Sequence, residues 1–134
     1  MEKINQLIIH LIALCNFCKD IHYNSKGEAF YSKHLLADRV QENINEYIDQ
    51  IKEVCILGND EKTLSSAEYL LKATSLIPAI AEDDKINFKS LENLLINTLS
   101  LIEQMEGTKG EENLYGNIAQ DLQNSLGLIN RQIK

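Results

Sequence analysis

The sequence predicts an all-α protein with four long helices and a short extra helix in the long crossover between the second and the third. Apolar residues recur at steps of three and four along most of the chain. A single proline, few aromatic residues and many Leu, Ile, Glu and Lys favour helices over strands. The length of 134 residues, with 44% hydrophobic and 25% charged, has room for one domain spanning residues 1–134.

The first two predicted helices form a hairpin. Apolar residues from Ile4 to Ile21 predict a first helix that ends near His22. The polar segment Asn24–Gly27 then turns the chain. The second predicted helix runs from Glu28 to Leu57 without interruption, because no proline or glycine lies within it, and Gly58 closes it. Its apolar residues, available for the core or for a partner, are Leu35, Val40, Ile44, Ile48, Ile51 and Val54.

The second half of the chain predicts the short helix and two further long helices. Thr63 or Ser65 caps the short helix. Asp83 or Asp84 caps the third long helix, which ends at Gly107. The long connection between the two hairpins favours a crossover bundle. The fourth helix carries apolar residues at helical spacing, namely Ile118, Leu122, Leu126 and Ile129.

The charge of the chain limits its partners. A net charge of −7 argues against nonspecific attraction to nucleic acid or anionic membranes. Lys3 is the only cation near the N-terminus, so there is no basic tail and we do not expect DNA binding. Leu7–Cys15 is apolar, but Leu14 does not suit a signal cleavage site, and no segment approaches the roughly 20 apolar residues of a membrane span. The sequence therefore predicts a cytoplasmic protein.

Three cysteines have two possible roles. Cys15 and Cys18 are one helical turn apart and suggest a thiol metal site, but zinc usually takes four ligands. In an antiparallel hairpin, Cys55 lies near the first residues of the chain and far from Cys18. We therefore favour packing of reduced thiols in the core, which suits a reducing compartment.

Two pairs of metal-ligand side chains lie on the second predicted helix. His34 and Asp38 are four residues apart and share a face, and Asp49 and Glu53 repeat this relation. Asp38 and Asp49 are eleven residues apart, close to three turns, so both pairs lie on one stripe. The midpoints of the pairs are roughly 22 Å apart along a helix, which is too far for one ion within one chain.

A second copy of the chain solves this separation. If two such helices pack antiparallel about a two-fold axis near Asn43 and Ile44, the first pair of one chain meets the second pair of the other. Imidazole and carboxylate ligands together suit Fe(II), and carboxylates favour Fe(III) still more. The spacing therefore predicts an iron site between subunits.

The segment His22-Tyr23-Asn24-Ser25-Lys26-Gly27-Glu28-Ala29-Phe30, followed by the two pairs, resembles the ferroxidase segment of the Dps family of miniferritins. The match covers about a third of the chain without a gap, and more loosely the short helix and the last helix also resemble the family. No Glu-x-x-His pair of ordinary ferritins occurs. The resemblance implies a ferritin-like four-helix bundle in a hollow homo-oligomer, a dodecamer in this family.

The resemblance also implies catalytic and metal-binding roles for five residues. His22, His34 and Asp38 come from one subunit, and Asp49 and Glu53 from its two-fold partner. His22, Asp38 and Glu53 hold the tighter iron, and Glu53 bridges to a weaker site near His34 and Asp49. The implied activity is oxidation of Fe(II) by hydrogen peroxide and storage of ferric mineral, which protects against oxidative damage.

Two other classes of protein stay open. An oxygen-using iron-storage cage, or a cage that only binds metal, keeps the same five ligands without a preference for peroxide. A structural helical oligomer uses the same stripe for packing, without catalysis. Substitution of the ligands separates these alternatives, because a structural role predicts no effect on the kinetics.

Two features near the implied site depart from the family or extend it. Tyr23 stands where relatives commonly carry Trp, and it either packs at the interface or takes up a stray electron. Glu111, Glu112 and Asp121 are candidates for pore carboxylates. Acids at a helix N-terminus usually interact with the helix dipole, and we favour that role.

Overall fold

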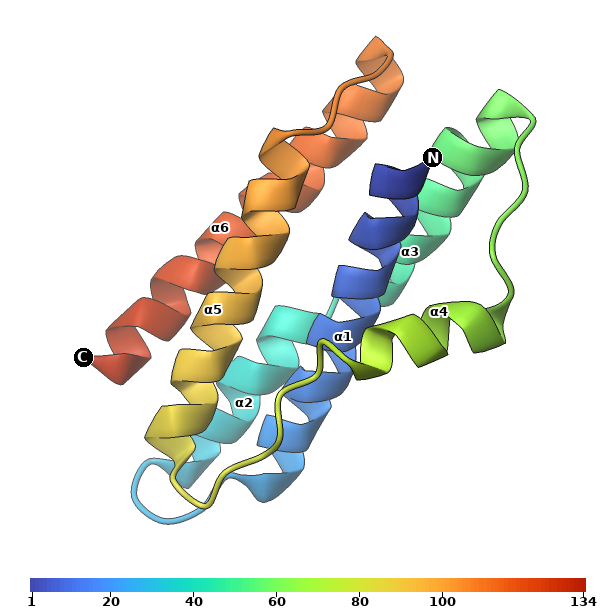
Figure 1. Ribbon diagram of the computed structural model, residues 1–134. Helices are drawn as coiled ribbons and strands as arrows, with labels where there is room; N and C mark the ends of the chain where they lie inside the picture. Colours follow the sequence, from blue (N-terminus) through green and yellow to red (C-terminus); the bar gives the residue numbers. More distant parts are fainter.

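The computed structural model describes residues 1–134 and is all-helical, with no strand (Figure 1). The predicted all-α class is therefore confirmed. The elements are α1 (Glu2–Asn24), α2 (Phe30–Gln41), α3 (Ile44–Ile51), η1 (Lys52–Ile56), η2 (Leu57–Asn59), α4 (Ser66–Thr74), α5 (Asp84–Glu103) and α6 (Lys109–Ile133). After α3 the helix continues through the π-helical segment η1 and the 3₁₀ turn η2.

Helix α1 lies at the centre of the arrangement. It packs against α2, α3, α4 and α5, while α6 packs against α5 and α2. Helix α2 runs back along α1, and α5 and α6 form a second antiparallel pair (Figure 1). The short helix α4 lies across the side of α1, within the long connection that returns the chain to the start of α5.

The core is one cluster of buried side chains drawn from every α-helix. Helix α1 contributes most to it, with Leu7, Leu11, Leu14 and Phe17 fully buried. By length and composition alone, α1 is also apolar enough to cross a membrane, so the expectation that no segment is long and apolar enough was wrong. However, 56% of its most apolar stretch is buried inside the chain, and a core helix has this composition for that reason.

The prediction of one uninterrupted helix over Glu28–Leu57 is wrong, because the helix is interrupted between α2 and α3. Ala29 has a left-handed backbone (φ 58°) and precedes α2, and Asn43 (φ −103°, ψ 1°) lies in the break. Asn43 Nδ2 and Tyr47 Oη both donate hydrogen bonds to Asp121 Oδ2 on α6, at 3.3 and 2.7 Å. Contacts with α6 therefore stabilise this interruption of the helix, although no glycine or proline lies near it.

The predicted caps are confirmed in α4 and α5, and α6 has a cap that the sequence analysis did not single out. The Ser65 hydroxyl accepts a hydrogen bond from the backbone N–H three residues on and caps α4. Asp83 caps α5, which ends at Glu103 instead of at Gly107. Thr108 caps α6 in a capping box. Side-chain capping thus sets where the helices of the second half begin.

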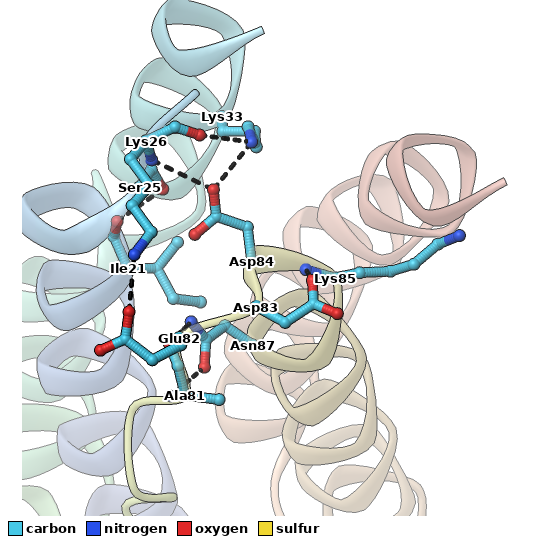
Figure 2. Close-up of polar contacts among 10 residues, drawn as sticks. All are labelled: Ile21, Ser25, Lys26, Lys33, Ala81, Glu82, Asp83, Asp84, Lys85 and Asn87. Atoms are coloured by element: carbon cyan, nitrogen blue, oxygen red, sulfur yellow. Dashed lines mark hydrogen bonds and ion pairs between the residues drawn. The ribbon is translucent and has the colours of Figure 1, made fainter. Parts of the chain in front are cut away.

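The turn between α1 and α2 is held by the N-terminal end of α5 (Figure 2). Asp84 Oδ2 accepts from Lys33 Nζ at 2.7 Å and from the backbone N–H of Lys26 at 3.1 Å. Lys33 Nζ also donates to the Lys26 carbonyl at 2.9 Å. Gly27 lies in this turn with φ 75°, a conformation that suits glycine. These contacts fix how the end of α1 faces the start of α2.

Candidate metal centre

The two predicted histidine ligands face each other across the α1–α2 hairpin. His22 Nδ1 lies 3.0 Å from the His34 carbonyl oxygen, and His34 Nδ1 lies 2.8 Å from the His22 carbonyl oxygen. The two rings stack, with centroids 3.5 Å apart and planes inclined by 22°. The two histidines that the resemblance assigns to one subunit therefore lie side by side within one chain.

These hydrogen bonds determine which ring nitrogens are free. A carbonyl oxygen only accepts, so each Nδ1 carries the proton and donates it. The neutral ring then has its lone pair on Nε2, the form in which histidine binds metals. A backbone carbonyl on the other ring nitrogen is also a common support for a metal-binding histidine. His22 and His34 are both half-buried, and each has one nitrogen ready for a metal ion.

The three predicted carboxylate ligands are exposed. Asp38 lies one turn after His34 on α2, and its Oδ1 accepts from Gln41 Nε2 at 3.0 Å. Asp49 lies on α3 and Glu53 lies in η1. Neither of these two side chains makes an ion pair or a hydrogen bond within the chain. All three carboxylates are therefore accessible to a metal ion or to a second molecule.

The structure divides the five residues between two places. His22, His34 and Asp38 lie at the α1–α2 hairpin, whereas Asp49 and Glu53 lie beyond the break that follows α2. Within one chain, no three His, Cys, Asp or Glu side chains gather in a way that could hold a metal ion. A site built from all five residues thus needs ligands from a second copy of the chain.

Aromatic side chains surround the histidine pair, and of these the sequence analysis singled out only Tyr23. The Tyr23 ring meets His22 edge-on at 5.0 Å, and the Phe30 and Tyr31 rings lie 5.2 and 6.5 Å from the His34 ring. Tyr23 is 78% exposed and Tyr31 is 68% exposed. Exposed apolar side chains that gather in one place are typical of an interaction surface.

The cysteines are all buried and unpaired, as expected for packing. Burial raises the pKa of Cys18, and the nearby Cys15 and Asp38 charges raise it further. Burial also raises the pKa of Cys15, although Lys19 opposes this. The pKa of the Cys55 thiol is raised by burial as well, despite a hydrogen bond from Tyr115. Burial therefore favours the protonated form of each thiol, as expected for cysteines that pack in the core.

The three acids considered as pore carboxylates all lie on α6, and two of them make contacts within the chain. Glu111 belongs to the capping box of α6, and Glu112 lies in the same first turn, as expected for residues that interact with the helix dipole. Asp121 accepts from Tyr47 Oη and lies 3.7 Å from Arg39 Nη1. Burial, together with this hydrogen bond, raises the pKa of Tyr47 to about 12. Glu111 and Asp121 therefore stabilise the packing of α6.

Comparison with known proteins does not assign this chain to a family. No model of a known protein family matches it, and no curated protein matches it. Any proposal about the function of this chain therefore depends on its residues and on their geometry. Of these, the reciprocal bonds between His22 and His34 are the most specific.

Proposed function

We propose that this protein is a miniferritin of the Dps type, which oxidises Fe(II), preferably with hydrogen peroxide, and stores the ferric product in a hollow oligomer. In this proposal α1, α2–α3, α5 and α6 are the four helices of a ferritin-like bundle, and α4 is the short helix of its crossover. The observation that carries the proposal is the histidine pair, whose hydrogen bonds leave one metal-binding nitrogen on each ring.

The position of the ligands supports a site between two subunits. One continuous stretch of chain carries a half-site with two histidines and an aspartate, followed by a half-site with Asp49 and Glu53. Two copies related by a two-fold axis join unlike half-sites twice, because an isologous contact is reciprocal. The break between α2 and α3 lies between the half-sites, at the place where the proposed axis passes.

The exposed apolar residues near the ligands support the same interface. Tyr23, Phe30, Tyr31 and Leu35 are between 42% and 78% exposed around the histidine pair. Val54 is also exposed beside Glu53. Burying such residues against a second copy removes apolar area from water and excludes solvent from the bound iron. In this proposal they form the rim of the two-fold contact.

The ligand types suit the proposed reaction. His22 and Asp38 of one copy, together with Glu53 of a second copy, hold the tighter Fe(II). His34 of the first copy and Asp49 of the second copy hold the weaker neighbouring iron. Each Fe(II) gives up one electron. The two electrons and two protons break the O–O bond of hydrogen peroxide and yield two molecules of water. Removing iron and peroxide together is how the reaction protects a cell.

The remaining expectations belong to the same proposal. A dodecamer with two-fold ferroxidase contacts is the assembly that the Dps resemblance implies. The buried reduced thiols suit a cytoplasmic protein. The net charge of −7 makes DNA an improbable partner, because binding to phosphates needs clustered cations.

Stopped-flow oxidation of loaded protein tests the proposal. Metal-free protein is loaded with Fe(II) under anaerobic conditions and mixed with hydrogen peroxide or, separately, with oxygen. We expect faster oxidation by peroxide, with about two irons consumed per peroxide. Faster oxidation by oxygen would instead indicate an oxygen-using storage cage. A rate no higher than that of Fe(II) in buffer would leave a structural or metal-binding role.

A further inference from the structure

We infer that the contact between Asn59 and Glu111 positions the Glu53 carboxylate for metal binding. Asn59 and Glu111 are then positioning residues for a ligand that lies on another element. This inference rests on the proposed function, because it assigns a role at the same site. Neither residue belongs to the five ligands that the sequence predicts.

The first step is the local geometry around Glu53, which lies in the π-helical segment η1. The backbone N–H of Leu57 bonds to the carbonyls of Lys52 and Glu53, so one turn here contains an extra residue. An extra residue rotates the side chains of the turn about the helix axis. Such turns cost stability and often occur at functional sites. The orientation of Glu53 relative to Asp49 therefore depends on what holds this turn.

The second step is the residue that holds the turn at its C-terminal side. Asn59 Nδ2 donates to the Cys55 carbonyl oxygen at 2.8 Å and to Glu111 Oε2 at 3.0 Å. Asp60, which follows, has a left-handed backbone (φ 55°), so the chain leaves the helix here. One amide group thus connects the carbonyl of a residue in η1 to a carboxylate on α6.

The third step is the rigidity of that carboxylate. Glu111 Oε1 accepts from the backbone N–H of Thr108 at 2.8 Å, and the residue is only 8% exposed. A Cβ placed on Gly107 would lie 2.7 Å from Glu111 Oε1, so glycine leaves the space that the carboxylate occupies. The Thr108 N–H and the Asn59 amide lower the pKa of Glu111, so it is ionised at neutral pH. Its hydrogen-bond partners hold Glu111 in one place.

The fourth step is a second contact from the same helix. Tyr115, one turn after Glu111 on α6, donates from Oη to Cys55 Sγ at 3.4 Å. The first turns of α6 therefore contact the Cys55 side chain directly through Tyr115, and they reach the Cys55 carbonyl only through Asn59. Loss of the Asn59 contact frees the backbone of η1 on one side. Glu53, which has no bond of its own within the chain, then loses the backbone position that this turn gives it.

Binding of Co(II) alone to metal-free protein tests this inference. Co(II) is a neighbour of Fe(II) in the affinity series, and its visible spectrum reports the ligand geometry. We expect Asn59→Ala to weaken Co(II) binding at the site that includes Glu53 by about 10-fold and to change the visible spectrum. Such an effect is typical when a group that orients a ligand is lost. Asn59 is exposed, so this variant keeps the fold.

Two further variants separate positioning from stability. Glu111→Ala should also weaken Co(II) binding, and the double variant should lose less affinity than the sum of the two single losses, because the two residues share one contact. Glu112→Gln, an exposed neighbour, is the matched control and should bind as wild type. Wild-type affinity and an unchanged spectrum in both alanine variants would overturn the inference alone. Equal Co(II) binding by wild type and Glu53→Ala would overturn the proposed function as well.

Discussion

Asp38→Ala and Glu53→Ala variants are expected to assemble as wild type does but to oxidise Fe(II) with peroxide more than about 100-fold more slowly. A group that only orients a ligand typically contributes 10- to about 100-fold, and loss of a ligand itself costs more. Both carboxylates are exposed in the single chain, and the only side-chain contact that either makes is the exposed Gln41–Asp38 hydrogen bond. Their removal should therefore change the folding free energy little.

Stopped-flow spectroscopy and sedimentation together measure this effect. Glu46→Ala is the matched control, because Glu46 is an exposed acid on α3 that is not among the proposed ligands. The control should keep the wild-type rate. Rapid oxidation in both ligand variants would show that the reaction does not use the proposed carboxylates.

Asp84→Ala is expected to lower the free energy of unfolding by about 2–3 kcal/mol. The side chains of Lys33 and Asp84 are only 14% and 11% exposed, so removing the aspartate leaves a largely buried ammonium without its partner. The Lys26 backbone N–H loses its acceptor at the same time. Glu82→Ala is the control, since its ion pair with Lys26 is exposed and should contribute little.

The effect of Asp84 should depend on pH with a definite sign. Burial alone raises the pKa of Asp84, but the hydrogen bonds from Lys33 and Lys26 outweigh it and hold the pKa below its usual range. A group with a lowered pKa contributes stability that is fully present above the pKa of the unfolded chain, about 3.9, and is lost as the pH falls through the folded value. Urea unfolding should show a smaller difference between wild type and variant at about pH 3 than at about pH 7. An equal difference at both pH values would contradict this account.

The parts of the fold that the sequence predicted depend on contacts that are local along the chain. Ser65 and Asp83 cap helices because their side chains reach backbone groups two or three residues on. The facing of His22 and His34 follows from a short turn between antiparallel helices, which leaves little choice of register. These relations need no knowledge of the rest of the chain.

The parts that the sequence missed depend on partners far along the chain. No residue between Glu28 and Leu57 disrupts a helix by its own conformational preference, yet the helix is interrupted near Asn43. Asp121 on α6, which accepts from Asn43, is 78 residues away. Asn59, which follows the π-helical turn at Glu53, likewise bonds to Glu111 on α6, 52 residues away. Local propensity carries no signal for bonds of this kind.

Mixed oligomers test the central claim, a site shared between two subunits, most directly. One variant carries His34→Ala and Asp38→Ala, and the other carries Asp49→Ala and Glu53→Ala. Each variant alone should be inactive. In a two-fold pair of unlike chains, one site contains only altered half-sites and the other contains only native ones. The variants are co-expressed with two different tags, so that mixed oligomers are isolated before the assay.

Random pairing makes half of the contacts unlike, and one of the two sites in each unlike contact is native. Mixed oligomers should therefore recover about a quarter of the wild-type rate of Fe(II) oxidation. A rate in the mixed oligomers no higher than that of either variant alone would contradict a site built from two chains.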